Sequence, residues 1–146
     1  MAMLKNQVSE LLWYGQIETT VDRAKAVRSL AEKYITIAMR AYQDDVKVTK
    51  TVTDAKGAKK EVVFTNDGPK KLAARRRLMA ELVDLQEIKG AKESKSAYKA
   101  RIKDTKHPLI EKMFKEYAPK YDARKNELGQ GGGYTRILKT GTRRGD

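Results

Sequence analysis

The sequence predicts an α+β protein in which several helices accompany an inserted β-hairpin and a short C-terminal strand. Apolar residues recur at helical spacing in several segments, whereas between residues 46 and 64 they alternate with polar residues. Near the end of the chain, the run from residue 134 to residue 139 follows three glycines and has the β-branched and apolar composition of a strand. A length of 146 residues indicates one domain, spanning residues 1–146.

Two helices are predicted near the N-terminus, over residues 3–14 and from residue 21 onward. The apolar stripe of the first consists of Leu4, Val8, Leu11 and Leu12. Gly15 follows and is placed to end the helix in a left-handed cap. Thr20 offers an N-cap for the second helix, in which apolar residues keep helical spacing for over five turns, as far as Tyr42.

Residues 46–64 predict a β-hairpin. Valines at 46, 48 and 52 alternate with lysines and threonines, and residues 54–58 read Asp-Ala-Lys-Gly-Ala, which is typical of a turn. The lysines along the hairpin indicate a finger that contacts RNA. With few large apolar residues, such a hairpin is expected to be marginally stable alone.

A third helix is predicted to open at Pro69, because proline is favoured at the first helical position. Its expected apolar side consists of Leu72, Met79, Leu82, Val83 and Leu85. Five cations crowd its first turns, namely Lys70, Lys71, Arg75, Arg76 and Arg77. They oppose the positive end of the helix dipole, and a phosphate bound there would remove the conflict. The alternative is a solvated cluster of charges.

Residues 86–107 form a polar, basic segment, with seven lysines and arginines against three acids, a local charge of +4. Tyr98 and Ile102 lie one helical turn apart, which predicts a short helix. We call residues 86–107 the excursion, and we expect it to become ordered on RNA. Pro108 then opens a fourth helix with apolar residues as far as Tyr117. Pro119 is expected to break that helix, and residues 121–130 are expected to connect it to the tail.

The tail, residues 131–146, has the composition of a small RNA-docking element. Arg136 and Lys139 lie among the apolar residues of the expected strand, and Arg143 and Arg144 lie on a tight turn behind it. The planar guanidinium group suits bidentate contact with phosphate. These four cations are therefore candidate RNA-binding residues.

The overall charge points to a polyanionic partner. The chain has 32 lysines and arginines against 19 acids, a net charge of +13. This excess destabilises a compact fold by self-repulsion unless a polyanion neutralises it, and nucleic acid gains affinity from such contacts. A solvated, charge-rich helical surface is the plainer alternative. The absence of cysteine excludes disulfides and thiolate zinc sites and fits a cytoplasmic protein. No apolar run is long enough to predict a membrane-spanning helix, and no helix has a large aromatic-rich apolar face, so we predict no membrane partner, although the charge leaves binding at a membrane surface open.

No constellation of catalytic residues is found in the sequence. His107 is the only histidine, is expected on the surface or in a loop, and has no candidate nucleophile beside it. The glycines at 129 and 131–133 are followed by neither Lys-Ser nor Lys-Thr, so they are not a nucleotide-binding loop. We therefore predict no enzyme, no cofactor, no metal site and no small-molecule substrate. An RNA-modifying or RNA-cleaving enzyme is the weaker alternative.

Five sequence blocks in order, together with the tail, resemble the family of ribosomal protein seventeen of the bacterial large subunit. The tail carries Gly-Gly-Tyr-Thr-Arg-Ile-Leu-Lys at 132–139 and Arg-Arg-Gly-Asp at 143–146. The other blocks lie at 2–6, at 17–20, at 23–25, at 72–76 and at 117–121. Any one block is weak, whereas their common order over nearly the whole chain is a strong signal.

The resemblance implies a two-layer fold, with several helices packed on a small sheet, and a structural role without catalysis. It implies that the chain lies in the cytoplasmic ribosome and binds large-subunit rRNA near the outer rim of the peptide exit tunnel, beside neighbouring large-subunit proteins. Positions that match basic rRNA contacts of the family are Arg23, Arg75, Arg76, Arg136, Arg143 and Arg144. A free regulatory or nucleoid-type protein that binds RNA or DNA is the alternative.

The sequence also departs from the family's usual pattern. It starts after the basic arm that usually begins family members, and it ends before the hydrophobic strand that usually follows Arg-Gly-Asp, so that either the sequence is trimmed or these elements are lost. Residues 46–64 and 86–107 resemble insertions relative to shorter members. We expect both insertions to lie at the periphery and to bind rRNA or a neighbouring protein.

Overall fold

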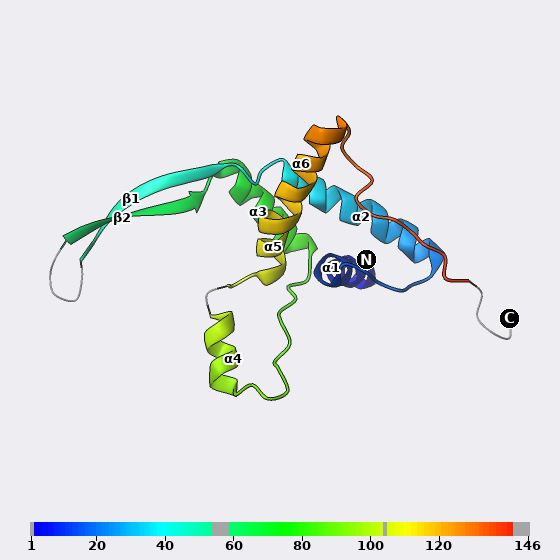
Figure 1. Ribbon diagram of the computed structural model, residues 1–146, viewed down its shortest axis with the longest axis horizontal. Helices are drawn as coiled ribbons and strands as arrows, with labels where there is room; N and C mark the ends of the chain where they lie inside the picture. Colours follow the sequence, from blue (N-terminus) through cyan, green and yellow to red (C-terminus); the bar gives the residue numbers. More distant parts are fainter. Residues whose placement is uncertain (1, 54–58, 104, 142–146) are drawn as a thin grey trace.

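The computed structural model describes residues 2–53, 59–103 and 105–141, and it confirms an α+β fold with a β-hairpin (Figure 1). The helices are α1 (Ala2–Tyr14), α2 (Val21–Met39), α3 (Pro69–Glu81), α4 (Lys95–Ile102), α5 (Pro108–Lys112), the π-helix η1 (Met113–Tyr117) and α6 (Ala118–Leu128). The strands are β1 (Asp45–Thr53) and β2 (Lys59–Asp67).

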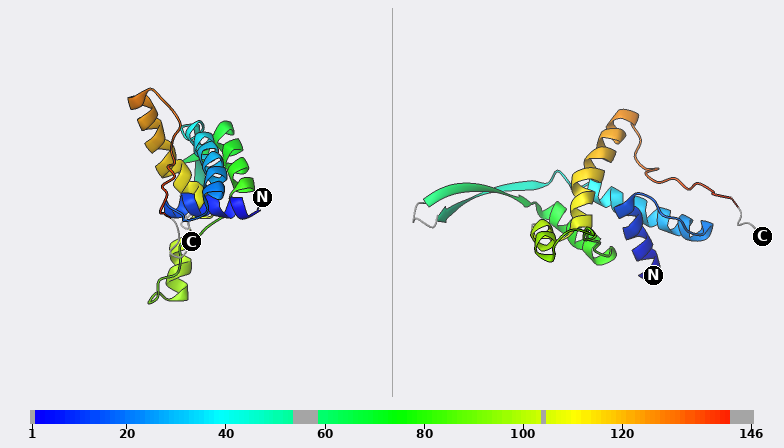
Figure 2. Two further views of the ribbon diagram at one scale, coloured as in Figure 1. Left: turned by 90° about the vertical axis from the view of Figure 1, so that its right-hand side faces the viewer. Right: turned by 60° about the horizontal axis from the view of Figure 1, so that its bottom comes forward.

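The core lies between helices. α2 contacts α1, α3 and the continuous helix formed by η1 and α6. The residues that fill this core with large buried side chains include Val8, Leu12, Val27, Ile35, Leu78, Leu109, Met113 and Phe114. The hairpin and the segment that carries α4 extend away from the helices in different directions (Figure 2). The helices therefore make a body with two appendages.

The hairpin is antiparallel, with Asp45 opposite Asp67 at its base and Thr53 opposite Lys59 at its far end. Among the described residues it forms the only sheet, and the helices pack on one another rather than on this sheet. The layered arrangement that the resemblance implied is thus replaced by a helical body with a projecting hairpin (Figure 1).

The strand expected at residues 134–139 is not formed in the structure. This segment is extended, but no other described strand lies beside it to supply the hydrogen bonds of a ladder. It instead passes alongside α2 (Figure 1). Tyr134 reaches the sulfur of Met39, and the Thr135 hydroxyl donates a hydrogen bond of 3.0 Å to Glu32.

The first helix ends as predicted, and its end is bound by α5 and η1. Gly15 follows Tyr14 in the left-handed region, with φ of 83°. The Tyr117 hydroxyl donates to the carbonyl of Leu12 over 2.8 Å, and the Lys112 ammonium donates to that of Trp13 over 2.7 Å. A cation at a helix C-terminus also complements the helix dipole.

The break expected at Pro119 is wrong, because the helix continues to Leu128. Proline removes one amide donor and clashes with the carbonyl four residues earlier in a regular α-helix. Here the preceding turn is a π-helix, in which the amide of Ala118 donates to the carbonyl of Met113, five residues back. The wider turn accommodates the proline without ending the helix.

The buried side of α3 also differs from the prediction. Leu78 and Leu82 are buried, whereas Leu72, Met79 and Val83 are largely exposed. The inward stripe instead contains two cations at helical spacing, which are described below. The second helix ends at Met39, and Tyr42 packs on the core from the turn that follows.

Candidate nucleic-acid interface

Two of the five cations at the start of α3 are directed into the protein. The side chain of Lys71 is 14% exposed and lies 2.6 Å from Asp45 and 3.5 Å from Asp67. The side chain of Arg75 is 19% exposed and lies 2.5 Å from both Asp67 and Glu111. We call these five residues the neck network, because they join the base of the hairpin to α3 and α5.

The neck network is held by charge and by an aromatic ring. Both the Lys71 ammonium and the Arg75 guanidinium lie over the ring of Phe114, at 5.8 Å and 5.2 Å from its centroid. Burial raises the pKa of the Asp67 carboxyl, but Arg75 and Lys71 outweigh it and hold that pKa below its ordinary value. Burial likewise raises the pKa of Glu111, and Arg75 and Lys115 bring it below the ordinary value.

The positive end of α3 is occupied by a carboxylate of the protein itself. Asp44 accepts hydrogen bonds from the backbone amides of Lys70 and Lys71, over 2.7 Å and 3.3 Å. A Cβ on Gly68 would lie 2.4 Å from the Asp44 carboxylate, so that any larger residue would displace this carboxylate from the cap. The amides that we assigned to a phosphate are thus already bound to Asp44, which removes the reason for placing a phosphate at this helix end.

The other predicted cations of α3 face solvent. Lys70, Arg76 and Arg77 are exposed, and none of them makes an ion pair within the described chain. Arg76 follows directly after Arg75, yet one residue is held inside the protein and the other points outward. The structure therefore divides the predicted cluster into a structural pair and three cations that are available to a ligand.

The remaining predicted cations lie with α2 and the tail. Arg23 is exposed in the first turn of α2, and Arg136 and Lys139 are exposed in the tail segment that runs along this helix (Figure 1). The tail is held by Tyr121, whose ring lies 4.6 Å from that of Tyr134. Arg143 and Arg144 lie outside the described residues. The structure thus places Arg23 on α2 and Arg136 and Lys139 on the tail segment that passes alongside this helix.

The excursion that carries α4 shows a further set of cations. Arg101 pairs with both Glu87 and Glu93, and its guanidinium lies over the ring of Tyr98. One cation thus binds both described acids of residues 86–107. Six lysines of this segment have no ion pair among the described residues and are exposed, namely Lys89, Lys92, Lys95, Lys99, Lys103 and Lys106.

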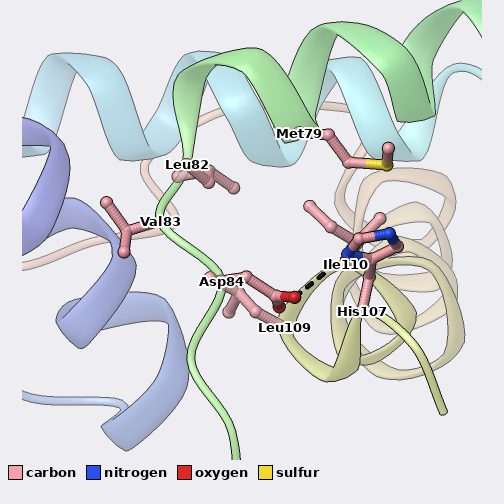
Figure 3. Close-up of a pocket in the computed structure, with 7 residues that line it drawn as sticks. All are labelled: Met79, Leu82, Val83, Asp84, His107, Leu109 and Ile110. Atoms are coloured by element: carbon pink, nitrogen blue, oxygen red, sulfur yellow. Dashed lines mark hydrogen bonds and ion pairs between the residues drawn. The ribbon is translucent and has the colours of Figure 1, made fainter.

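The excursion begins and ends beside a small hollow of about 160 Å³. Figure 3 shows the residues that line it: Met79, Leu82, Val83, Asp84, His107, Leu109 and Ile110. His107 Nδ1 lies 3.0 Å from Asp84 Oδ2, and this pair closes the two ends of the excursion. His107 is thus half-buried near the surface and paired with a carboxylate, and the other lining residues are aliphatic, without a nucleophile.

The sequence alone did not identify the acidic residues that pair with Lys71 and Arg75 inside the protein. We interpreted the acids as surface ion pairs, although a hairpin places Asp45 opposite Asp67, and two facing carboxylates require cations nearby. Lys71 lies one helical turn after Asp67, which was a usable signal. Glu111 has no such local signal, because only the packing of α5 on α3 brings it to Arg75.

No group of residues that could hold a metal ion occurs in the described part of the chain. A search over residues 2–53, 59–103 and 105–141 also finds no helix long and apolar enough to cross a membrane.

The comparisons with known proteins identify one family. The model of the family described as Ribosomal protein L17 matches residues 3–146. The large ribosomal subunit protein bL17 of Lachnospira eligens is 38% identical over 165 residues, which cover 99% of this chain and 86% of that protein. The protein of the same name from Clostridium acetobutylicum is 34% identical, over 99% of this chain and 77% of its own length.

Proposed function

The chain belongs to the ribosomal protein L17 family, and we propose that it binds large-subunit rRNA near the outer rim of the peptide exit tunnel. Family membership makes it a structural, non-enzymatic constituent of the large ribosomal subunit. The rRNA contact and its location are the proposed part, and the resemblance of the tail and of five sequence blocks supports the location.

One observation carries the RNA contact: the net charge of +13 is not neutralised within the protein. Among the described residues, the neck network and Arg101 take part in more than half of the ion pairs, and exposed cations remain on three surfaces. These surfaces are the outer side of α3, the α2 side with the tail, and the excursion. Phosphates would relieve their mutual repulsion and release counterions.

The proposed rRNA-binding residues follow from this division. They are Arg23, Lys70, Arg76, Arg77, Arg136 and Lys139, together with the six exposed lysines of the excursion. Arg143 and Arg144 remain proposed contacts from the sequence. Lys71 and Arg75 support RNA binding indirectly. They hold the hairpin base and α3 in place beside the exposed cations.

We further propose that the chain acts as one domain with two peripheral insertions in the cytoplasmic ribosome. The helical body is rigid because its apolar residues pack in one core, and the cations are mounted on its helices. In this arrangement the protein holds together rRNA segments that meet at its surface, and neighbouring ribosomal proteins lie beside it.

Sedimentation of a cell lysate through a sucrose gradient, at low salt and after a high-salt wash, tests the proposed function. Co-migration with the large subunit in equimolar amount, surviving the wash, is expected. Release into the top fractions would instead favour a free regulatory protein that binds RNA or DNA. In purified subunits, ultraviolet cross-links from Arg76 and Arg136 to rRNA segments at the tunnel rim would test the location.

A further inference from the structure

We propose that one face of the hairpin docks on a neighbouring protein of the large subunit, on a surface with an apolar centre and a carboxylate beside it. This inference rests on the proposed function only in requiring that the chain is assembled into the subunit. It assigns to the hairpin a protein partner rather than RNA.

The register divides the hairpin into two different faces. Because opposite residues of an antiparallel pair share a face, one face carries Val46, Val48, Lys50, Val52, Lys60, Val62, Phe64 and Asn66. We call it the valine face. The opposite face carries the threonines 49, 51, 53 and 65 with Val63 and Glu61. Five of the eight positions on the valine face are thus apolar, against one valine among the central positions of the other.

The valine face is uncovered in the described part of the chain. Val62 is 39% exposed, Phe64 is 40% exposed and Val46 is 45% exposed. The strands touch the helical body at their base, where β2 contacts α3 and Asp45 of β1 pairs with Lys71. A row of half-exposed apolar side chains on a two-stranded sheet is stabilised when a partner covers it, since an isolated hairpin is marginal in water.

The chemistry of the valine face favours protein over RNA. Valine side chains offer neither a hydrogen bond nor a ring to a base, whereas RNA-binding sheets stack bases on aromatic residues. The one aromatic residue, Phe64, has the Lys50 ammonium over its ring, 5.9 Å from the centroid. A protein surface gains from burying β-branched residues in a way that the phosphate backbone does not.

The charges on the valine face also indicate the charge of the partner surface. Its two ionisable residues are Lys50 and Lys60, and the acids of both strands, Asp45, Glu61 and Asp67, lie on the opposite face. A complementary surface therefore places a carboxylate opposite Lys50, beside an apolar centre opposite the valines.

Val62 and Val63 provide a matched pair for the experiment. They are neighbours in β2, have the same side chain and are both exposed, Val63 at 61%, but they lie on opposite faces. A diazirine amino acid is placed at position 62 or at position 63 of the full chain, and large subunits are purified and irradiated. We expect adducts from position 62 on one ribosomal protein, in a peptide that contains aspartate or glutamate.

Two results would overturn the docking of the hairpin on a protein. One is a predominant rRNA adduct from position 62, which would make the hairpin an RNA finger. The other is an equal yield of protein adducts from positions 62 and 63. Both results require that the chain sediments with the subunit, so they are distinguishable from failure of the proposed function, in which the chain does not sediment with it at all.

A second measurement uses Val62→Asp and Val63→Asp in assembled subunits. Val62→Asp places a carboxylate in the apolar contact and should raise amide hydrogen exchange across residues 59–67 by roughly tenfold or more, as expected for the loss of one buried valine. Val63→Asp has the same effect on strand propensity and should leave the exchange nearly unchanged. Equal increases in both variants would contradict docking through the valine face.

Discussion

The two appendages of the molecule, the hairpin and the excursion, differ in how they are attached and in what they carry. Five charged side chains hold the base of the hairpin, whereas among the described residues one polar pair, Asp84 with His107, joins the ends of the excursion. The described hairpin has four lysines against three acids, while residues 86–107 have an excess of four positive charges. The firmly attached appendage is thus nearly neutral and apolar on one face, and the loosely attached one is polar and cationic.

This difference indicates that the two appendages recognise different kinds of partner. A near-neutral hairpin with a mainly apolar face suits a partner of defined shape, and its firm base fixes the direction in which it points. A cationic segment with a weak closure suits the polyanion that we propose as its partner. We thus infer that the two appendages use different recognition chemistry.

The largest effect is expected from breaking the attachment of the hairpin. Arg75→Met leaves Asp67 and Glu111 half-buried without their main partner and should lower the free energy of unfolding by about 3 kcal/mol. Chemical denaturation of the purified chain measures it. Arg76→Met is the control, since this exposed neighbour should change stability by less than about 0.5 kcal/mol. Similar losses in both variants would refute the structural role of Arg75.

The cap of α3 should give the next largest effect. Gly68→Ala places a methyl group 2.4 Å from the Asp44 carboxylate and should destabilise the protein by roughly 1–3 kcal/mol. Gly90→Ala is the control, because its nearest contact would be at 3.5 Å.

A double-mutant cycle in thermal unfolding tests the cause of the Gly68 effect. In an Asp44→Ala background the clash disappears, so Gly68→Ala should then cost clearly less. An unchanged cost would show that Asp44 is not the obstacle.

Acidification should loosen the hairpin in the same way. The pKa values of Asp67 and Glu111 lie below their ordinary values in the folded state, because Arg75 outweighs burial. A depressed pKa stabilises the fold above the unfolded pKa, and this stability is lost as the pH falls through the folded pKa. Stability should therefore fall below about pH 4, the ordinary range of carboxyl groups. Unfolding from pH 6 to pH 2 measures this loss, and Arg75→Met should flatten it.

The excursion is tested through salt. Lys95→Ala with Lys99→Ala should reduce the slope of log affinity for rRNA against log salt by roughly one unit for each lost phosphate contact. Filter binding at several salt concentrations measures it. On the hairpin, Lys47→Ala should leave the slope unchanged, because we assign that appendage to a protein. A change for Lys47 as large as for Lys95 would remove the distinction between the two appendages.

The smallest effect is expected from the closure of the excursion. Asp84→Asn removes the charge beside His107 and should cost less than about 1 kcal/mol, as is typical of exposed pairs. Global unfolding should hardly change, whereas amide exchange in residues 95–102 should rise in the free protein. Unchanged exchange there would show that other contacts hold the excursion.

Much of the fold could be predicted because its signals are local. Helical spacing, Gly15, Pro69 and the alternation in residues 46–64 each depend on neighbours in sequence, and the corresponding elements are confirmed. The tail strand was wrong because a strand needs a partner, and no residue of the segment reveals that it lacks one. The break at Pro119 was wrong because proline disfavours a regular α-helix but not one that widens in the turn before it.

The candidate site was less predictable for the same reason. Charge and spacing identified the basic start of α3, but they could not separate Arg75 from Arg76. That separation depends on Glu111, which lies 36 residues away and is brought near by packing. The contacts of the cations with rRNA stay predictions, and so do those of Arg143 and Arg144.

The π-helix has a consequence for insertions and deletions in this chain. One extra residue in a helical turn rotates everything after it by about 100°. Here that rotation brings Asp122 to the Tyr42 hydroxyl at 2.8 Å and Tyr121 to the ring of Tyr134. Deleting a single residue from η1 would keep the chain helical but turn both side chains off their partners. The rotation that η1 introduces therefore decides whether Tyr121 keeps its contact with the tail where the tail lies on α2.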